Sequence, residues 1–415
     1  MSVEIYKNFK LEFDEIFKIS ILAFKLNRAH PAIPRNAIWA VHFVVVHGTF
    51  SMVFAALVYS ILYYMQNDNV SEACASGIMS VVFIVVSMKH FITTWCQNLF
   101  IILMDTVKND FTLAENLSVV EKNFVIQYAL KGKKVTKIWL LISAIISISF
   151  PLKAMFIMGY YAVVDQFRLV PMFDSFHPKI MEKTENFTFF VVLFLLCVFY
   201  DVYANIMYTA FAPMGPIFML HACGQLEVVK NRVQTLFPDG YDPEETKAKL
   251  KDIVQRLQNI YEFVEIINTT FKLFYEFLLR ATSVFLPLIV YLLIEDFKHG
   301  RLSMEYLTFI LGGFVISFIP CYYSNLLMEK GEEVRQSVYS SGWEKSMDRR
   351  ARSTILIVLT RATRPVAVRT VFRTVDLAAF SDNFIDFFEY LISFNNFIII
   401  IDFKVFHKVY HNTFI

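Results

Sequence analysis

The sequence is short of charge, glycine and proline. Only 18% of its 415 residues are Asp, Glu, Lys or Arg, whereas an ordinary soluble protein has about 25%. Glycine and proline number 12 each, which excludes collagen-like and low-complexity disordered chains. The net charge of +2 is too small to indicate a nucleic-acid partner, and no basic arm is present.

Cysteine and catalytic motifs are also missing or sparse. The five cysteines are scattered, with no CxxC pair and no Cys/His spacing that is typical of a metal site. We find no nucleophile elbow, no P-loop and no paired-carboxylate signature. The sequence therefore predicts no metal, no cofactor and no enzymatic activity.

Apolar residues dominate instead. They make up 56% of the chain and include 44 Phe and 20 Tyr, which is typical of an integral membrane protein. A membrane helix needs about 20 mostly apolar residues, and six segments meet this requirement. They are Ala37–Tyr64, Ala75–Met104, Ile138–Val164, Phe187–Leu220, Leu273–Ile294 and Leu307–Met328. A seventh candidate, Ser353–Asp382, is weaker because it contains four arginines.

Positive charge orients these spans. Four segments with six Lys or Arg each alternate with three loops that have none, three and two. The first set is residues 1–36, 105–137, 221–265 and 330–352, and the second is residues 65–74, 165–185 and 296–304. Because cytosolic loops are enriched in Lys and Arg, we expect a cytosolic amino terminus and, after seven spans, an extracellular carboxyl terminus. G-protein-coupled receptors have the reverse orientation.

Two of the charged segments outside the predicted spans carry a further pattern. Residues 1–36 carry Phe9, Phe13, Phe17, Ile21 and Phe24 at helical spacing, which predicts an amphipathic helix along the membrane face or against the bundle.

The second segment follows the sixth span. Residues 331–354 are predicted to form a helix outside the bilayer, with Tyr339 and Trp343 on one face because they are four residues apart. The tryptophan fits either a headgroup position or a packing anchor between subunits, and the residues alone leave both open.

Three stretches carry a family resemblance. "HACGQLEVVKNRVQTLF" (His221–Phe237), "YSSGWEKS" (Tyr339–Ser346) and "LTRATRPVAVRTVFRTVDLAAFSD" (Leu359–Asp382), in this order and with the inverted topology, resemble the insect odorant receptors in their moth branch. The resemblance covers roughly residues 10–382.

The resemblance implies an all-α bundle of seven transmembrane helices with a cytosolic anchor domain and a split seventh helix. It also implies a non-selective cation channel that opens when a small volatile lipophilic ligand binds. The channel would be a heterotetramer of this chain and an olfactory co-receptor subunit. The resemblance further implies that the protein is embedded in the lipids of the plasma membrane, in the dendrites of olfactory sensory neurons. The chain would then divide into an amphipathic segment (1–36), six spans with the ligand pocket (37–329) and an anchor helix (330–364). The pore-lining half of the seventh helix would follow, beginning at Pro365 (365–382), and an atypical tail would end the chain (383–415).

The resemblance, together with the topology, selects site residues. The ligand would lie in the outer halves of the second, third, fourth and sixth spans, where aromatic and Met side chains form an adaptable apolar wall. These residues are Met79, Phe83, Val86, Phe150, Met155, Met158, Tyr161, Phe190, Leu193, Tyr306, Phe309 and Ile310. For any one of them, ordinary helix packing or a lipid-facing position is the alternative.

Two further sets follow from the resemblance. A hydrophobic gate is expected at Val375, Leu377, Ala379 and Phe380, because the preceding arginines would repel a cation. Subunit anchoring is expected at Tyr339, Trp343, Arg349 and Arg350. A transporter is the alternative function, but we see no internal repeat.

The tail departs from the family. In residues 383–415, 23 of 33 residues are Phe, Tyr, Ile, Asn or Lys, and none is Gly, Ala, Arg or Pro. The first group can be encoded with A and T alone, whereas the second requires G or C. This bias predicts translated non-coding DNA from an unspliced final intron, and hence a non-conducting, misspliced receptor as another alternative; a genuine divergent terminus remains open.

Overall fold

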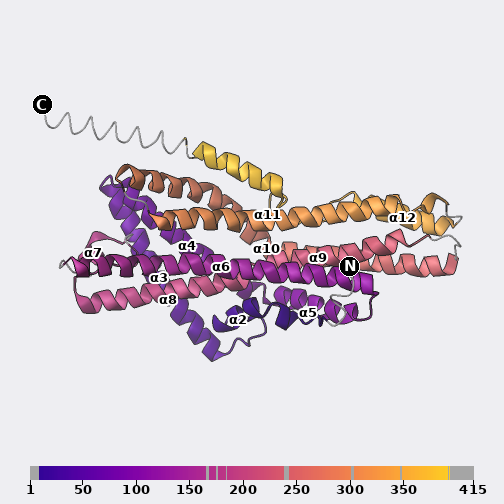
Figure 1. The fold of residues 1–415 in the computed structure, drawn as a ribbon, viewed down its shortest axis with the longest axis horizontal. Helices are drawn as coiled ribbons and strands as arrows, with labels where there is room; N and C mark the ends of the chain where they lie inside the picture. The colour runs from indigo at the N-terminus through magenta and orange to yellow at the C-terminus, as the bar shows by residue number, and fades with distance from the viewer. Residues whose placement is uncertain are drawn as a thin grey trace.

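The computed structural model describes residues 9–164, 168–173, 176–183, 185–237, 243–300, 303–345, 348–390 and 392. Within these ranges the chain is almost entirely helical. Figure 1 shows long helices lying along one axis, with α7 (Pro178–Lys183) near one end and α12 (Arg349–Ala362) at the other. We call these the outer end and the inner end, following the charge-based orientation.

Among the described residues, six helical segments are long and apolar enough to cross a membrane. They are α3 (Ala37–Gln66), α4 (Val70–Trp95), α6 (Val119–Val163), α8 and α9 together (Phe187–Phe211 and Met214–Gln234), α10 (Pro243–Lys298) and α11 (Met304–Tyr339). The six clear predicted spans are therefore confirmed. The seventh is not among them, although residues 377–390 form a helix.

Local sequence explains where the long helices begin. Asn36, Asn69, Ser118 and Asn186 each occupy an N-cap position, and each side chain accepts a hydrogen bond from a backbone N–H of the first turn. Such caps satisfy donors that have no partner inside the helix. An apolar run follows Asn36, Asn69 and Asn186 directly, whereas α6, which Ser118 caps, begins with a charged stretch and becomes apolar only from Ile138.

The amino-terminal segment packs against the bundle. It forms α1 (Phe13–Ile16) and α2 (Lys18–Leu26), and Phe13, Phe24 and the intervening Phe17 are buried. Ser20 Oγ donates to the carbonyl of Thr209 over 3.1 Å, and Asn27 Nδ2 donates to that of Tyr203 over 3.0 Å. Both acceptors belong to α8, so the second of the two predicted placements is the one found.

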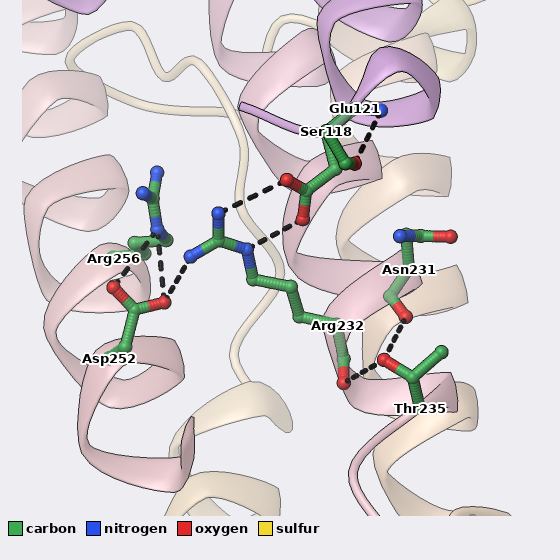
Figure 2. Close-up of polar contacts among 7 residues, drawn as sticks. All are labelled: Ser118, Glu121, Asn231, Arg232, Thr235, Asp252 and Arg256. Atoms are coloured by element: carbon green, nitrogen blue, oxygen red, sulfur yellow. Dashed lines mark hydrogen bonds and ion pairs between the residues drawn. The ribbon is translucent and has the colours of Figure 1, made fainter. Parts of the chain in front are cut away.

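The inner end is closed by ion pairs (Figure 2). Arg232, near the end of α9, donates from Nε to Glu121 Oε1 over 2.7 Å and also binds Asp252 near the start of α10. Arg256 binds Asp252 from one turn away, at 3.2 Å. Glu121 is itself in the first turn of α6, where its N–H bonds to Ser118. One guanidinium therefore joins three helices at their inner ends.

A second ionic group joins α9 to α11. Lys330 Nζ lies 2.7 Å from Glu227 and 2.8 Å from Glu333, and Lys230 Nζ lies 2.6 Å from Glu333. Because these charges alternate in sign, each side chain has an opposite charge beside it. The connection between α5 (Gln97–Ala114) and α6 lies at the same end (Figure 1).

The predicted helix over residues 331–354 is wrong. α11 ends at Tyr339, and Gly342 adopts a φ of +80°, a left-handed conformation that glycine tolerates best. A short 3₁₀ turn, η1 (Trp343–Lys345), follows, and α12 returns beside α11. Tyr339 and Trp343 therefore do not share a helix face; instead Trp343 Nε1 donates to the Tyr339 carbonyl over 3.2 Å.

The seventh helix does not begin at Pro365, so that prediction is also wrong. Residues 364–376 are non-helical, and the next helix starts at residue 377. Side chains from other spans take the backbone donors of this segment: Ser324 Oγ accepts from Val368 N–H at 3.2 Å and Asn268 Oδ1 from Arg369 N–H at 2.9 Å. Asp376 caps the new helix by accepting from Ala379 N–H at 2.7 Å.

Candidate ligand cavity

A cavity of about 170 Å³, here called the apolar cavity, lies between five spans. α6 contributes a face that runs from Trp139 to Phe150, and α8 contributes residues 200–208. α4, α10 and α11 complete the wall with mainly aliphatic and aromatic side chains. Gly312 and Gly313 of α11 also line it, and their lack of side chains lets Ile146 and Leu286 approach α11 closely.

Polar side chains form a strip on one wall of the apolar cavity. Ser147 Oγ donates to Asp201 Oδ2 over 2.6 Å. One turn deeper, Asn205 Nδ2 donates to the Ser143 carbonyl over 3.1 Å, and Ser143 Oγ bonds with Thr209 at 2.9 Å. These groups satisfy one another between α6 and α8, which is what buried polar groups require.

A larger hollow, which we call the vestibule, lies between the apolar cavity and the outer end. It measures about 1060 Å³ and has charged walls that include Glu72, Asp296 and His299. Lys153 on α6 and Glu305 on α11 form an ion pair in its wall, with 3.1 Å between Nζ and Oε2. The contrast in lining marks a change from a polar entrance to an apolar interior.

Five residues line both hollows: Ile78, Met79, Phe150, Phe173 and Phe309. The ring centroid of Phe150 lies 5.2 Å from that of Phe173 and 5.3 Å from that of Phe309. Phe173 comes from the loop before α7, whereas the other two rings come from α6 and α11. We call these three rings the aromatic partition, because they lie where the vestibule and the apolar cavity meet.

The structure brings five of the twelve predicted ligand residues to these hollows. Met79, Phe150 and Phe309 line both, and Tyr161 and Tyr306 line only the vestibule. The other seven line neither hollow: Phe83, Val86, Met155, Met158, Phe190, Leu193 and Ile310.

Two physical causes account for several of these misplaced residues. On α6 and α8 the apolar cavity lies deeper than expected, at residues 139–150 and 200–208 rather than near residue 155 or 190. Met155, nearer the outer end, is exposed. Phe83 is not in the lining but packs on a residue that is, because its ring stacks on that of Tyr200 with centroids 3.7 Å apart.

Sequence reasoning missed the fifth span and the polar strip. α10 contributes Leu278, Thr282, Phe285 and Ile289, although it was not among the expected walls. A signal was present in the third and fourth spans: Trp139, Ser143 and Ser147 are spaced by four, as are Asp201 and Asn205. Such spacing places small and polar side chains on one helix face.

The family model for the 7tm odorant receptor matches residues 69–383. The chain belongs to the odorant receptor family. Its members are receptors rather than enzymes, and the six long apolar helices make this receptor a multi-pass membrane protein. A search of curated proteins gave no match.

Solved structures show the same fold for this odorant receptor. The insect olfactory receptor OR5 from Machilis hrabei superposes with a TM-score of 0.74 at 16% identity, covering 92% of this chain and 98% of that one. OR5 in complex with eugenol gives a TM-score of 0.68 at 16% identity, covering 92% and 97%. The fold is therefore the all-helical bundle of insect olfactory receptors.

The predicted gate residues of the receptor have mixed positions. Val375 and Ala379 are buried inside the chain itself, so they have no surface left to line a pore between subunits. Leu377 is partly buried, and Phe380 packs against Phe314 and Phe318 with centroids 5.3 and 5.4 Å apart. The exposed face of the helix over residues 377–390 carries Ala378, Ser381, Asp382, Ile385 and Glu389 instead.

The predicted anchor residues lie at the inner end of the receptor. Tyr339 is 71% exposed, whereas Trp343 is half-buried against the core of its own chain. Arg349 and Arg350 are exposed in the first turn of α12. Most of the predicted tail lies outside the described residues, which end with residues 390 and 392.

Proposed function

We propose that this odorant receptor is the ligand-tuned subunit of a cation channel. A small lipophilic volatile occupies the apolar cavity, and its binding opens a pore shared with an olfactory co-receptor subunit. The observation that carries the proposal is an apolar cavity next to a vestibule with charged walls in a chain of the odorant receptor family. A similar structure in complex with eugenol supports a small ligand.

The proposal includes an orientation and a location. The amino terminus and the ionic groups at the inner end face the cytosol, and the vestibule faces outward in the plasma membrane of an olfactory dendrite. The excess of Lys and Arg in the inner segments supports this orientation. An outward vestibule also gives an airborne ligand that has dissolved in the surrounding fluid a route to the cavity.

The surface that lines the pore differs from the one expected from the sequence, which was Val375, Leu377, Ala379 and Phe380. We assign it to the exposed side of the helix that begins at residue 377, where the Asp382 side chain is 66% exposed and lies 3.9 Å from the Arg373 guanidinium. A carboxylate repeated around a pore favours cations. The family match ends at residue 383, next to the compositional change, which supports a boundary between receptor and atypical tail.

The pore assignment is tested with Asp382→Asn. We expect a lower single-channel conductance and a several-fold lower permeability to divalent cations, with unchanged ligand sensitivity, in patch-clamp recordings with the co-receptor. The same recordings on Asp386→Asn, one turn further along the helix, provide the comparison for Asp382→Asn. Conductance and divalent permeability that stay at the wild-type values in Asp382→Asn would show that this carboxylate lies outside the conduction path.

The receptor function is tested by expressing the chain with and without a co-receptor and recording current against a panel of volatiles. Ala281→Phe, which fills part of the apolar cavity, should raise the half-maximal concentration at least tenfold. Ala55→Phe, on an exposed face of α3, is the matched control and should change little. Ligand uptake in proportion to current would favour the transporter alternative.

If the full chain is silent, the tail is tested directly. Replacing residues 383–415 by the carboxyl terminus of a conducting family member should restore current if the chain is misspliced. Sequencing the 3′ end of the transcript then identifies the source of the tail, because a fully spliced message that encodes these residues would rule out an unspliced intron.

A further inference from the structure

One face of α2 packs on the bundle and the other is exposed. The side that carries Phe24 is buried. On the opposite side Lys18, Leu22 and Lys25 follow one another at helical spacing, and all three are exposed. Leu26, next to Lys25, is 61% exposed. Leucines that alternate with lysines on one exposed face are typical of a helix that lies in the surface of a membrane.

The contacts of α2 place it at the inner boundary of the membrane. Ser20 and Asn27 donate to the carbonyls of Thr209 and Tyr203, near the inner end of α8. At 1.5 Å per residue, Tyr203 and Thr209 lie about 24 and 33 Å along α8 from its first residue, Phe187. The hydrocarbon core of a bilayer is about 30 Å thick. α2 therefore lies where the hydrocarbon core ends, and Figure 1 shows it at the edge of the bundle, near the middle of the long axis.

Two tryptophans mark the same level. Trp39 Nε1, in the first turn of α3, donates to the Arg28 carbonyl over 3.1 Å. The Arg35 guanidinium lies 5.7 Å from the centroid of the Trp39 ring and binds the carbonyl of Thr94, which precedes Trp95. Trp95 ends α4 and is 78% exposed. Because tryptophan is enriched where hydrocarbon meets headgroups, the loop that joins α2 to α3 lies at the headgroup level.

The charge of this region has one sign. From residue 16 to residue 67 the sequence contains no Asp or Glu, and it contains Lys18, Lys25, Arg28 and Arg35. The last preceding acid, Glu15, is three residues before Lys18, at the end of α2 away from the loop. Within the described residues, Lys25 and Arg28 are exposed and form no ion pair. We call Lys25, Arg28 and Arg35 the basic corner.

The start of α3 adds an apolar surface beside the basic corner. Ile38, Val41 and Val45 are spaced by three and four residues, so they share one face of the helix. They are 62%, 63% and 57% exposed. This strip continues from the level of Trp39 into the hydrocarbon region, where acyl chains can lie along it.

We propose that the basic corner binds an anionic phospholipid of the cytosolic leaflet, with the acidic headgroup against Lys25, Arg28 and Arg35 and the acyl chains along Leu26 and the start of α3. Basic side chains near the cytosolic surface attract anionic lipids, whereas the cationic amine of phosphatidylcholine would be repelled. This inference rests on the orientation in the proposed function, which places the basic corner at the cytosolic leaflet. It adds a lipid partner that is separate from the ligand of the apolar cavity.

The test measures quenching of Trp39 fluorescence by phospholipids that are brominated near the headgroup end of an acyl chain, since bromine quenches tryptophan on contact. The full chain is reconstituted in vesicles as the Trp95→Phe variant. Of the other tryptophans, Trp139 is only 3% exposed and Trp343 lies beyond the membrane at the inner end. Trp39 is therefore the tryptophan that lipid can reach.

We expect brominated phosphatidylserine to quench Trp39 with about fivefold higher relative affinity than brominated phosphatidylcholine, the effect of roughly one basic side chain near an anionic surface. Lys25→Gln combined with Arg28→Gln should reduce this preference to about twofold or less, and high salt should weaken it. The matched control, Lys247→Gln combined with Lys251→Gln, removes the same charge from the exposed start of α10 and should leave the preference unchanged.

Quenching by phosphatidylcholine serves as a control for folding, and it should be the same in all variants. Equal quenching by the two lipids, or a preference that persists in the Lys25 and Arg28 double variant, would overturn the inference. Displacement of phosphatidylserine by soluble glycerophosphoserine would also overturn it, because the site would then recognise a free phosphate. Vesicles carry each lipid in both leaflets, so these results do not depend on orientation. An amino-terminal tag that antibodies reach on intact cells would overturn the proposed orientation instead.

Discussion

The two ends of the bundle are built on different principles. Towards the inner end, α9 is buried along most of its length and ionic groups join its end to α6, α10 and α11. Towards the outer end, the helices separate around the apolar cavity and the vestibule. Close packing gives low tolerance to change, whereas a hollow keeps space for a ligand at the expense of packing contacts. The comparison suggests a rigid base that holds an adaptable receptor half.

The largest expected effect is a loss of stability in a glycine variant of α9, which we compare with a glycine variant in the cavity wall. A Cβ at Gly215, in α9, would collide with the Tyr275 hydroxyl, whose ring is buried beneath it. We expect Gly215→Ala to lower stability by about 1–3 kcal/mol, the usual cost of overpacking, and to reduce the amount of receptor at the cell surface.

The matched variant is Gly312→Ala in the cavity wall. Its Cβ would lie 2.8 Å from the flexible end of Ile146, which can move into the cavity. Surface labelling should therefore be near normal while ligand potency falls. Equal loss of surface receptor in both glycine variants would break the distinction between a rigid base and an adaptable outer half.

The next effect concerns the ion pairs in Figure 2. Arg232→Met leaves Glu121 buried without its bidentate partner, and we expect a loss of about 2 kcal/mol, on the scale of hydrogen bonds to charged groups. Thermal unfolding of the purified receptor measures it. Arg256→Met, which removes a partner of Asp252 only, should lower the free energy of unfolding by less than half as much. A larger loss in this control would show that the contacts of Asp252 stabilise the inner end more than those of Glu121.

The smallest expected effect sharpens the comparison at the outer end. Phe309→Ala removes one ring of the aromatic partition, and the vestibule and apolar cavity should then merge. We expect bulkier volatiles to gain several-fold in potency while compact ones lose a few-fold through lost contacts, in dose–response recordings. Phe314→Ala, a ring on the same helix outside both hollows, is the control. An unchanged size preference in Phe309→Ala would argue against a selective partition.

Much of the fold could be predicted because membrane helices carry their own signal. A continuous apolar run must be helical in lipid, where every backbone group needs an internal partner, so six spans were found from length and composition. The reversal at Gly342 and the non-helical residues 364–376 were missed. Both depend on turns and on side-chain partners, such as Asn268 and Ser324, that lie far away in the chain.

The sequence by itself determined the class of protein, the number of clear spans, the charge asymmetry between the two ends and the resemblance that the family match then established. Only the tertiary structure decided which residues surround the cavity. A cavity is space left between helices, and its depth depends on how residues such as Gly312 and Gly313 meet Ile146 and Leu286 on other helices. Local periodicity shows which face of a helix is apolar, but it does not show at what level neighbouring helices separate, because that is a property of their packing rather than of any one segment.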